Sequence, residues 1–189
     1  MKDKYIKVMV GILLAFCLHL VISPAWAEEY SNKKYGIKIK GPDGWKLDTD
    51  FQEYSKGGIK KITLAGFSKK LDKGMAMMSI EIREFPQGHP DLKLSLKEFV
   101  ELSVQRSEQK TKIINAIGDI EIGGKKGVRY VVERTANNPS IPKIYKFFIA
   151  LFRLNEREFL EFQTRTYPAE YFDANLAVFE ETLKSISFK

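Results

Sequence analysis

Cysteine and histidine are almost absent from this sequence of 189 residues, and their scarcity excludes several kinds of site. The only cysteine, Cys17, and one of the two histidines, His19, lie in an N-terminal segment that we expect to be removed. The rest of the chain therefore offers no disulfide, no thiolate nucleophile, no iron–sulfur cluster and no cysteine-ligated zinc. Because His89 is then the one remaining histidine, a three-histidine zinc site and an HExxH site are excluded as well.

The N-terminal segment is typical of a secretory signal peptide. Lys2, Lys4 and Lys7 precede an apolar run over residues 8–22, and Ser-Pro-Ala-Trp-Ala at 23–27 has the small-x-small pattern of a cleavage site. The apolar run is short for a membrane span, which takes roughly 20 residues. We therefore predict cleavage after Ala27 and an exported protein, periplasmic or secreted, that keeps no stable membrane anchor.

The remaining residues, 28–189, predict a single domain without repeats or linkers. Removing three lysines and Asp3 with the signal peptide lowers the net charge from +7 to +5. Acidic residues are interspersed with the lysines, so we interpret most of the lysines as solvated turn residues and expect no nucleic-acid partner. The residues present indicate no cofactor.

Alternation of apolar and polar residues predicts a series of strands. The run at 143–154 is almost entirely apolar, which is typical of a central strand covered on both faces. Gly-Gly-Lys-Lys-Gly at 123–127 predicts a hairpin turn, and 137–142 a loop. The predicted strands are residues 35–40, 59–67, 78–83, 112–122, 128–134, 143–154, 158–166 and 185–188.

Two helices are predicted. Ser95 and Glu98 form a capping box that begins a helix ending near residue 109. Pro168 opens the second helix, whose apolar stripe faces the sheet. Trp45 follows a turn at 41–44, and we expect its ring to close one end of the core. The stripe consists of Phe172, Leu176, Phe179 and Leu183.

Strands, helix, strands and helix in this order predict an α+β fold in which helices sandwich an antiparallel sheet. Several short segments, in this order and spacing, also resemble a known family. With the capped helix and the glycine-bounded hairpin, they make residues 30–188 similar to the PsbP superfamily, which includes DcrB-like bacterial envelope proteins. The resemblance implies a PsbP-like α/β/α sandwich and an accessory or binding role rather than catalysis. The segments are Tyr30-Ser31-Asn32, Tyr35-Gly36-Ile37, Pro42-Asp43-Gly44-Trp45 and Phe179-x-x-x-Leu183-x-x-Ile186-x-Phe188.

Two clusters invite a metal interpretation, and in both we favour a structural one. Met75, Met77 and Met78 resemble thioether sites for copper(I), but methionine also fills gaps in cores, and Met78 continues an apolar strand face. Asp48-x-Asp50 resembles a calcium loop that lacks its glycine and its distal glutamate. We therefore predict no metal site.

Catalytic motifs are also missing. Lys125-Lys126 lies in a glycine-rich turn without P-loop spacing, and no Gly-x-Ser-x-Gly elbow occurs. His89 lies in a loop with no identifiable nucleophile. We assign no catalytic residue and predict that the protein is not an enzyme, although a site assembled from distant residues stays open.

The polar positions of three strands suggest a partner-binding face. If these strands lie in one antiparallel sheet, their polar side chains can share a face that the helices do not fully cover. The alternative is simply the solvated side of a sheet. The predicted face comprises Arg83, Arg129, Glu133, Glu161, Gln163 and Arg165.

Three functions follow from these observations. We favour a non-enzymatic accessory protein of the cell envelope that binds another protein. A carrier of a small or lipid-like ligand requires a cavity of roughly 300 Å³ or more between sheet and helix. A hydrolase requires polar groups of perturbed pKa that converge in a cleft.

Overall fold

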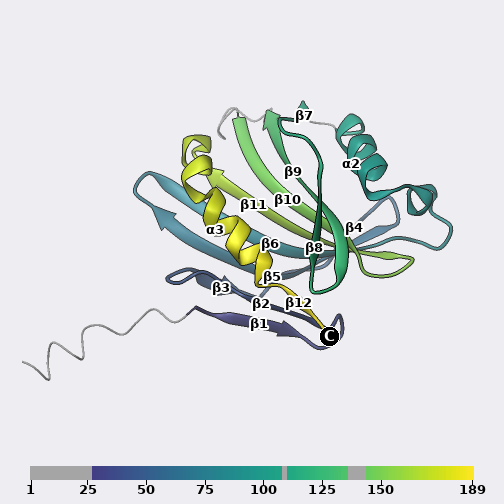
Figure 1. Cartoon of the computed structure of the whole chain (residues 1–189), viewed down its shortest axis with the longest axis horizontal. Helices are drawn as coiled ribbons and strands as arrows, with labels where there is room; N and C mark the ends of the chain where they lie inside the picture. Colours follow the sequence, from purple (N-terminus) through teal and green to yellow (C-terminus); the bar gives the residue numbers. More distant parts are fainter. Residues whose placement is uncertain (1–26, 108–109, 136–143) are drawn as a thin grey trace, which may run out of the picture.

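Two antiparallel sheets and two α-helices form the part of the chain that this computed structural model describes, residues 27–107, 110–135 and 144–189 (Figure 1). The smaller sheet joins β1 (Glu29–Asn32), β2 (Ile37–Lys40) and β12 (Ser187–Phe188) in the order β1-β2-β12. The larger sheet has the order β3-β5-β6-β11-β10-β9-β7, with β4 paired to β5 and β8 to β9. Its strands are β3 (Lys46–Asp48), β4 (Tyr54–Lys56), β5 (Ile59–Leu71), β6 (Gly74–Glu84), β7 (Thr111–Ile113), β8 (Gly118–Ile122), β9 (Lys125–Thr135), β10 (Ile144–Arg153) and β11 (Glu158–Tyr167).

Short hairpins connect the long strands. The β5–β6 pairing continues to Leu71 and Gly74, so only residues 72–73 turn between them. The predicted strand ended at residue 67 because the next residues are polar, but β6 supplies them with a backbone partner and the ladder runs on. At the β8–β9 turn, Gly123 and Gly124 have φ values of 53° and 75°, the left-handed region that glycine adopts without strain.

β10 is buried on both faces, as its continuous apolar run predicts. Ala150 and Phe152 belong to one hydrophobic cluster, whereas Ile149 and Leu151 belong to the other. Successive side chains on a strand point to opposite faces, so β10 contributes to both cores. The two cores therefore lie on opposite faces of the larger sheet.

The helix α3 (Phe172–Lys184) covers one face, which we call the α3 face (Figure 1). Its stripe residues Phe172, Phe179 and Leu183 are buried, while Leu176 is half-buried at the margin of the same cluster. Trp45 is 5% exposed, and its ring meets Phe179 edge-on at 6.3 Å. The smaller sheet adds further cover through β2.

The helix α2 (Leu96–Gln105) lies over the opposite face, the α2 face. Ser95 and Glu98 form the predicted capping box, but the helix ends at Gln105, and residues 108–109 lie outside the described part of the chain. Phe99 stacks on Phe159 at 5.1 Å. The short 3₁₀ helix before it (Pro90–Lys93) is held to β10, because Arg153 donates 2.8 Å hydrogen bonds to the carbonyls of Leu92 and Leu94.

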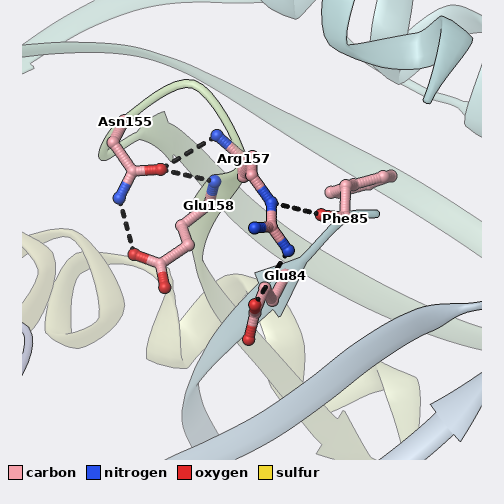
Figure 2. A network of polar contacts seen from close by, with 5 residues as sticks. All are labelled: Glu84, Phe85, Asn155, Arg157 and Glu158. Atoms are coloured by element: carbon pink, nitrogen blue, oxygen red, sulfur yellow. Dashed lines mark hydrogen bonds and ion pairs between the residues drawn. The ribbon is translucent and has the colours of Figure 1, made fainter. Parts of the chain in front are cut away.

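A polar network fastens the β10–β11 turn to the end of β6 (Figure 2). The side chain of Asn155 accepts from the amides of Arg157 and Glu158 at 2.9 Å and donates to the Glu158 carboxylate at 2.7 Å. Arg157 donates to the carbonyl of Phe85 at 3.0 Å and pairs with Glu84 at 3.2 Å. The network fixes the position of the strand that follows, β11.

The fold is mostly antiparallel sheet with one helix on each face, so the predicted sandwich is only partly right. On the α3 face the smaller sheet supplies part of the cover, and on the α2 face a ten-residue helix leaves part of the sheet open. The predicted loop at 137–142 and the predicted signal peptide up to residue 26 lie outside the described residues. No helix in the described ranges is long and apolar enough to cross a membrane.

Candidate functional site

The uncovered part of the α2 face forms a cleft of about 500 Å³ between α2 and the sheet, which we call the α2 cleft. Strands β5, β6, β11, β10 and β9 form its floor, and residues at the end of α2 form its rim. Its apolar lining includes Phe99, Val132 and Ile149. Its charged lining consists of Lys56, Lys61, Arg83, Arg106, Arg134 and Glu161.

A buried ion pair lies in the floor of the cleft. The guanidinium of Arg83 on β6 contacts the carboxylate of Glu161 on the neighbouring strand β11. The side chain of Glu161 is 2% exposed and that of Arg83 is 21% exposed. Burial opposes the charge of Arg83, but the neighbouring carboxylate of Glu161 outweighs this effect, and the pKa of Arg83 is raised.

Strand β9 contributes two further polar side chains, Tyr130 and Arg134. Burial raises the pKa of Tyr130, and the negative charge of Glu161 acts in the same direction, so the phenol stays protonated near neutral pH. Burial lowers the pKa of Arg134, while Glu161 acts to raise it. The Arg134 guanidinium lies 4.8 Å from the centroid of the Phe147 ring, a cation–π arrangement.

Three buried polar atoms of this cluster have no hydrogen-bond partner in the described part of the chain: Nε of Arg83, Nε of Arg134 and Oε1 of Glu161. Most buried polar atoms in folded proteins are hydrogen-bonded. The cluster therefore retains two N–H donors and one carboxylate acceptor that the described residues leave unused.

Two other cations that line the cleft form ion pairs at its rim. Lys61 pairs with Glu81 at 3.3 Å, and Nη1 of Arg106 donates to both carboxylate oxygens of Asp91 at 3.0 Å. Within the described ranges, Arg134 forms no ion pair. Arg134 is thus a cation of the cleft whose charge a bound group can neutralise.

Comparison with solved structures shows a PsbP-like architecture. Cyanobacterial PsbP from Synechocystis matches with 15% sequence identity and a TM-score of 0.59, over 89% of this chain and 95% of that chain. The fold is PsbP-like. A Pseudomonas aeruginosa protein of unknown function matches with 13% identity and a TM-score of 0.49, over 85% of this chain and 95% of that one. No family model and no curated protein matches the sequence.

Within this PsbP-like fold, the predicted partner-binding face is divided between the two sides of the sheet. Glu161, Gln163 and Arg83 line the α2 cleft, and Arg165 lies on the same side, beside a smaller hollow of about 270 Å³. Arg129 and Glu133 lie on the α3 face. The prediction of one shared face of six residues is therefore wrong.

The pairing register explains the error. Leu151 on β10 pairs with Glu161 on one side and with Val128 on the other, so β9 presents its even-numbered residues on the face of Glu161. Arg129, one position later, points the other way and pairs with Glu180 of α3 at 2.7 Å. Glu133 pairs with Lys112 at 3.1 Å.

Tyr130 and Arg134 are absent from the predicted face, although both fall within the predicted strand 128–134. Val128, Tyr130 and Val132 alternate along this strand, and Arg134 continues their alternation. That alternation was the available signal, because residue 134 falls on the same face as Tyr130.

The remaining candidates have local structural contacts. The Nδ1 atom of His89 accepts from the amide of Asp91 at 3.3 Å, and its ring packs edge-on against Phe85 at 5.1 Å. Met78 is 2% exposed and belongs to the α3-face core, whereas Met75 is 41% exposed. Across the described residues, no group of three or more His, Cys, Asp or Glu side chains is placed to hold a metal ion.

Proposed function

We propose that this protein is an exported, non-catalytic accessory protein that binds another protein through the α2 cleft. The observation that carries the proposal is that Arg83, Arg134 and Glu161 line one concavity and that each has a buried polar atom without a hydrogen-bond partner among the described residues. Unused polar groups in a cleft favour recognition, because a bound group can restore the hydrogen bonds that burial removed.

The chemistry of the lining favours binding over hydrolysis. The cleft meets one requirement of a hydrolase, since polar groups with perturbed pKa values converge there. However, Glu161 is engaged by Arg83, and the phenol of Tyr130 keeps its proton. The Ser107 hydroxyl hydrogen-bonds to Thr111 at 3.0 Å rather than to a base. Accessory roles are also what the PsbP resemblance implies.

A small anion is the second candidate occupant, because the cleft volume of about 500 Å³ lies within the usual range for small-molecule sites. The charged lining disfavours a lipid-like chain, which would leave these side chains dehydrated and unpaired. A small-ligand carrier would therefore carry a polar, anionic compound.

Export is the other part of the proposal. It rests on the basic, apolar and small-residue regions of residues 1–27, which are expected to be removed before Glu28. N-terminal sequencing of protein recovered from the periplasm or medium should begin at Glu28. An intact chain recovered with the membranes would contradict this expectation.

Site-specific photo-crosslinking tests the binding function. A photoreactive phenylalanine analogue replaces Ser103, which lines the cleft, or Lys184, which is exposed on α3 and serves as the control. In the native cells, the Ser103 variant should give an adduct of discrete mass that contains a second protein. No adduct from Ser103, or the same adduct from Lys184, would overturn the proposal.

A further inference from the structure

We propose that the group recognised in the α2 cleft is the carboxylate of an acidic residue in an extended peptide segment, bound by the guanidinium of Arg134. This inference rests on the proposed binding function and adds the chemistry of the bound segment. It makes Arg134, which is absent from the predicted face, the principal recognition residue.

Arg134 has the properties of a carboxylate receptor. One face of its guanidinium lies against the Phe147 ring, and its Nε is buried without an acceptor among the described residues. A half-buried cation that forms no ion pair within the described ranges has lost hydration that a bound anion can replace. The planar guanidinium fork matches the two oxygens of a carboxylate or a phosphate.

Glu161 distinguishes between these two anions. Its residue is 1% exposed, and its Oε1 atom has no described donor. A phosphate dianion brings a second negative charge close to this carboxylate. An acidic residue within a peptide brings only a single negative charge and is therefore repelled less by Glu161. The pair Arg134 and Glu161 therefore favours a peptide over inorganic phosphate.

The space beside the cluster also fits a peptide. A second hollow of about 470 Å³ shares Lys61, Arg83, Phe99 and other lining residues with the α2 cleft. Its lining adds Tyr54, Ile59 and Phe85, together with Asp91, whose carboxylate pairs with Arg106. The two hollows are neighbours that share part of their lining, and the second adds apolar side chains beside the charged cluster. A segment with an apolar residue next to an acidic one complements both.

NMR of the ¹⁵N-labelled protein tests this proposal directly, because each arginine Nε–H group gives its own signal. The probes are a capped tetrapeptide Ala-Glu-Phe-Ala, its counterpart Ala-Gln-Phe-Ala, and inorganic phosphate at equal ionic strength. The glutamate peptide should shift the Arg134 Nε–H signal saturably. The glutamine peptide should bind about tenfold more weakly, as loss of a charge-assisted pair predicts. Phosphate should also bind about tenfold more weakly, because Glu161 repels its second negative charge.

Arg129 provides a matched control on the same strand and the opposite face, where it pairs with Glu180. Arg134→Gln should abolish saturable binding of the glutamate peptide, whereas Arg129→Gln should leave its affinity unchanged. Arg134→Lys should bind the peptide weakly, because an ammonium keeps the charge without the planar fork.

The outcomes separate this inference from the binding function. Equal response of Arg134 to phosphate and to the glutamate peptide would overturn carboxylate recognition. No shift with any probe, while Ser103 still crosslinks a protein, would overturn it as well and leave the binding function standing. Peptide binding that is lost in Arg134→Gln, without any Ser103 adduct in cells, would support the chemistry and contradict the accessory function.

Discussion

The ion pair between Arg83 and Glu161 leads to an asymmetric prediction for stability. Arg83→Met leaves a carboxylate that is 2% exposed without its cation, and should cost roughly 3–5 kcal/mol of unfolding free energy. Glu161→Gln leaves a guanidinium that is 21% exposed and reaches water, so a loss of roughly 1–3 kcal/mol is expected. The double variant removes both charges and should be more stable than Arg83→Met alone by about 1–2 kcal/mol.

Urea unfolding followed by the fluorescence of Trp45 measures these changes. Trp45 is the only tryptophan of residues 28–189 and lies in the α3-face core, away from the pair. Lys38 provides a control, because its pair with Glu29 is exposed at 41% and 52%. Lys38→Met should change stability by no more than about 0.5 kcal/mol.

Two results would refute the reasoning. One is a larger loss from Glu161→Gln than from Arg83→Met, since the more buried charge should be the more costly one to leave unpaired. The other is a double variant whose loss equals the sum of the two single losses, because independent residues add and a coupled pair does not.

Three further predictions concern single residues. Trp45→Ala should lower the free energy of unfolding, measured in urea, by roughly 3–5 kcal/mol. Iodide should quench the fluorescence of native Trp45 poorly, because the residue is 5% exposed. Strong quenching would contradict a core role. Burial raises the pKa of Tyr130 above its ordinary 10.0. The unfolded chain therefore ionises first, and the stability that Tyr130 contributes is complete below about pH 10 and falls by about 1.4 kcal/mol per pH unit above it. Tyr130→Phe should remove this part of the alkaline loss, and an unchanged pH dependence would show that the phenol is not responsible. At Gly127 an added Cβ would lie 2.6 Å from the carbonyl oxygen of Leu151, so Gly127→Ala should lower the melting temperature clearly. Gly118→Ala should not lower it, because a Cβ added there meets only Arg129, at 3.8 Å. Equal effects of the two substitutions would refute the steric explanation.

Features set by neighbours in the sequence were predictable. The capping box at Ser95 and Glu98 and the stripe of Phe172, Phe179 and Leu183 depend on spacings within a single helix. The uninterrupted apolar run of β10 likewise indicates burial on both faces without knowledge of its partners. Only Leu176, at the edge of the stripe, is less buried than the pattern suggests.

The candidate site depends instead on how distant strands are aligned. Alternation shows that Arg129 and Tyr130 point to opposite faces, but not which of them joins Glu161. Both faces of β9 carry valines, so hydrophobicity does not decide the matter either. The register with β10 decides it, and that register is a contact between segments far apart in the chain. Arg134 becomes part of the site only once this alignment is known.

The small sheet has a consequence for how the chain folds. Its middle strand, β2, pairs with β12, so residues near 37 meet residues near 188. The amide of Lys189 also donates to the carbonyl of Gly36 at 2.8 Å, and the hydroxyl of Ser185 bonds to the backbone of Lys40. Contacts at such sequence separation slow folding and cannot form before the final residues are available. A chain that has not yet been synthesised to residue 188 therefore cannot complete the smaller sheet that covers part of its α3-face core.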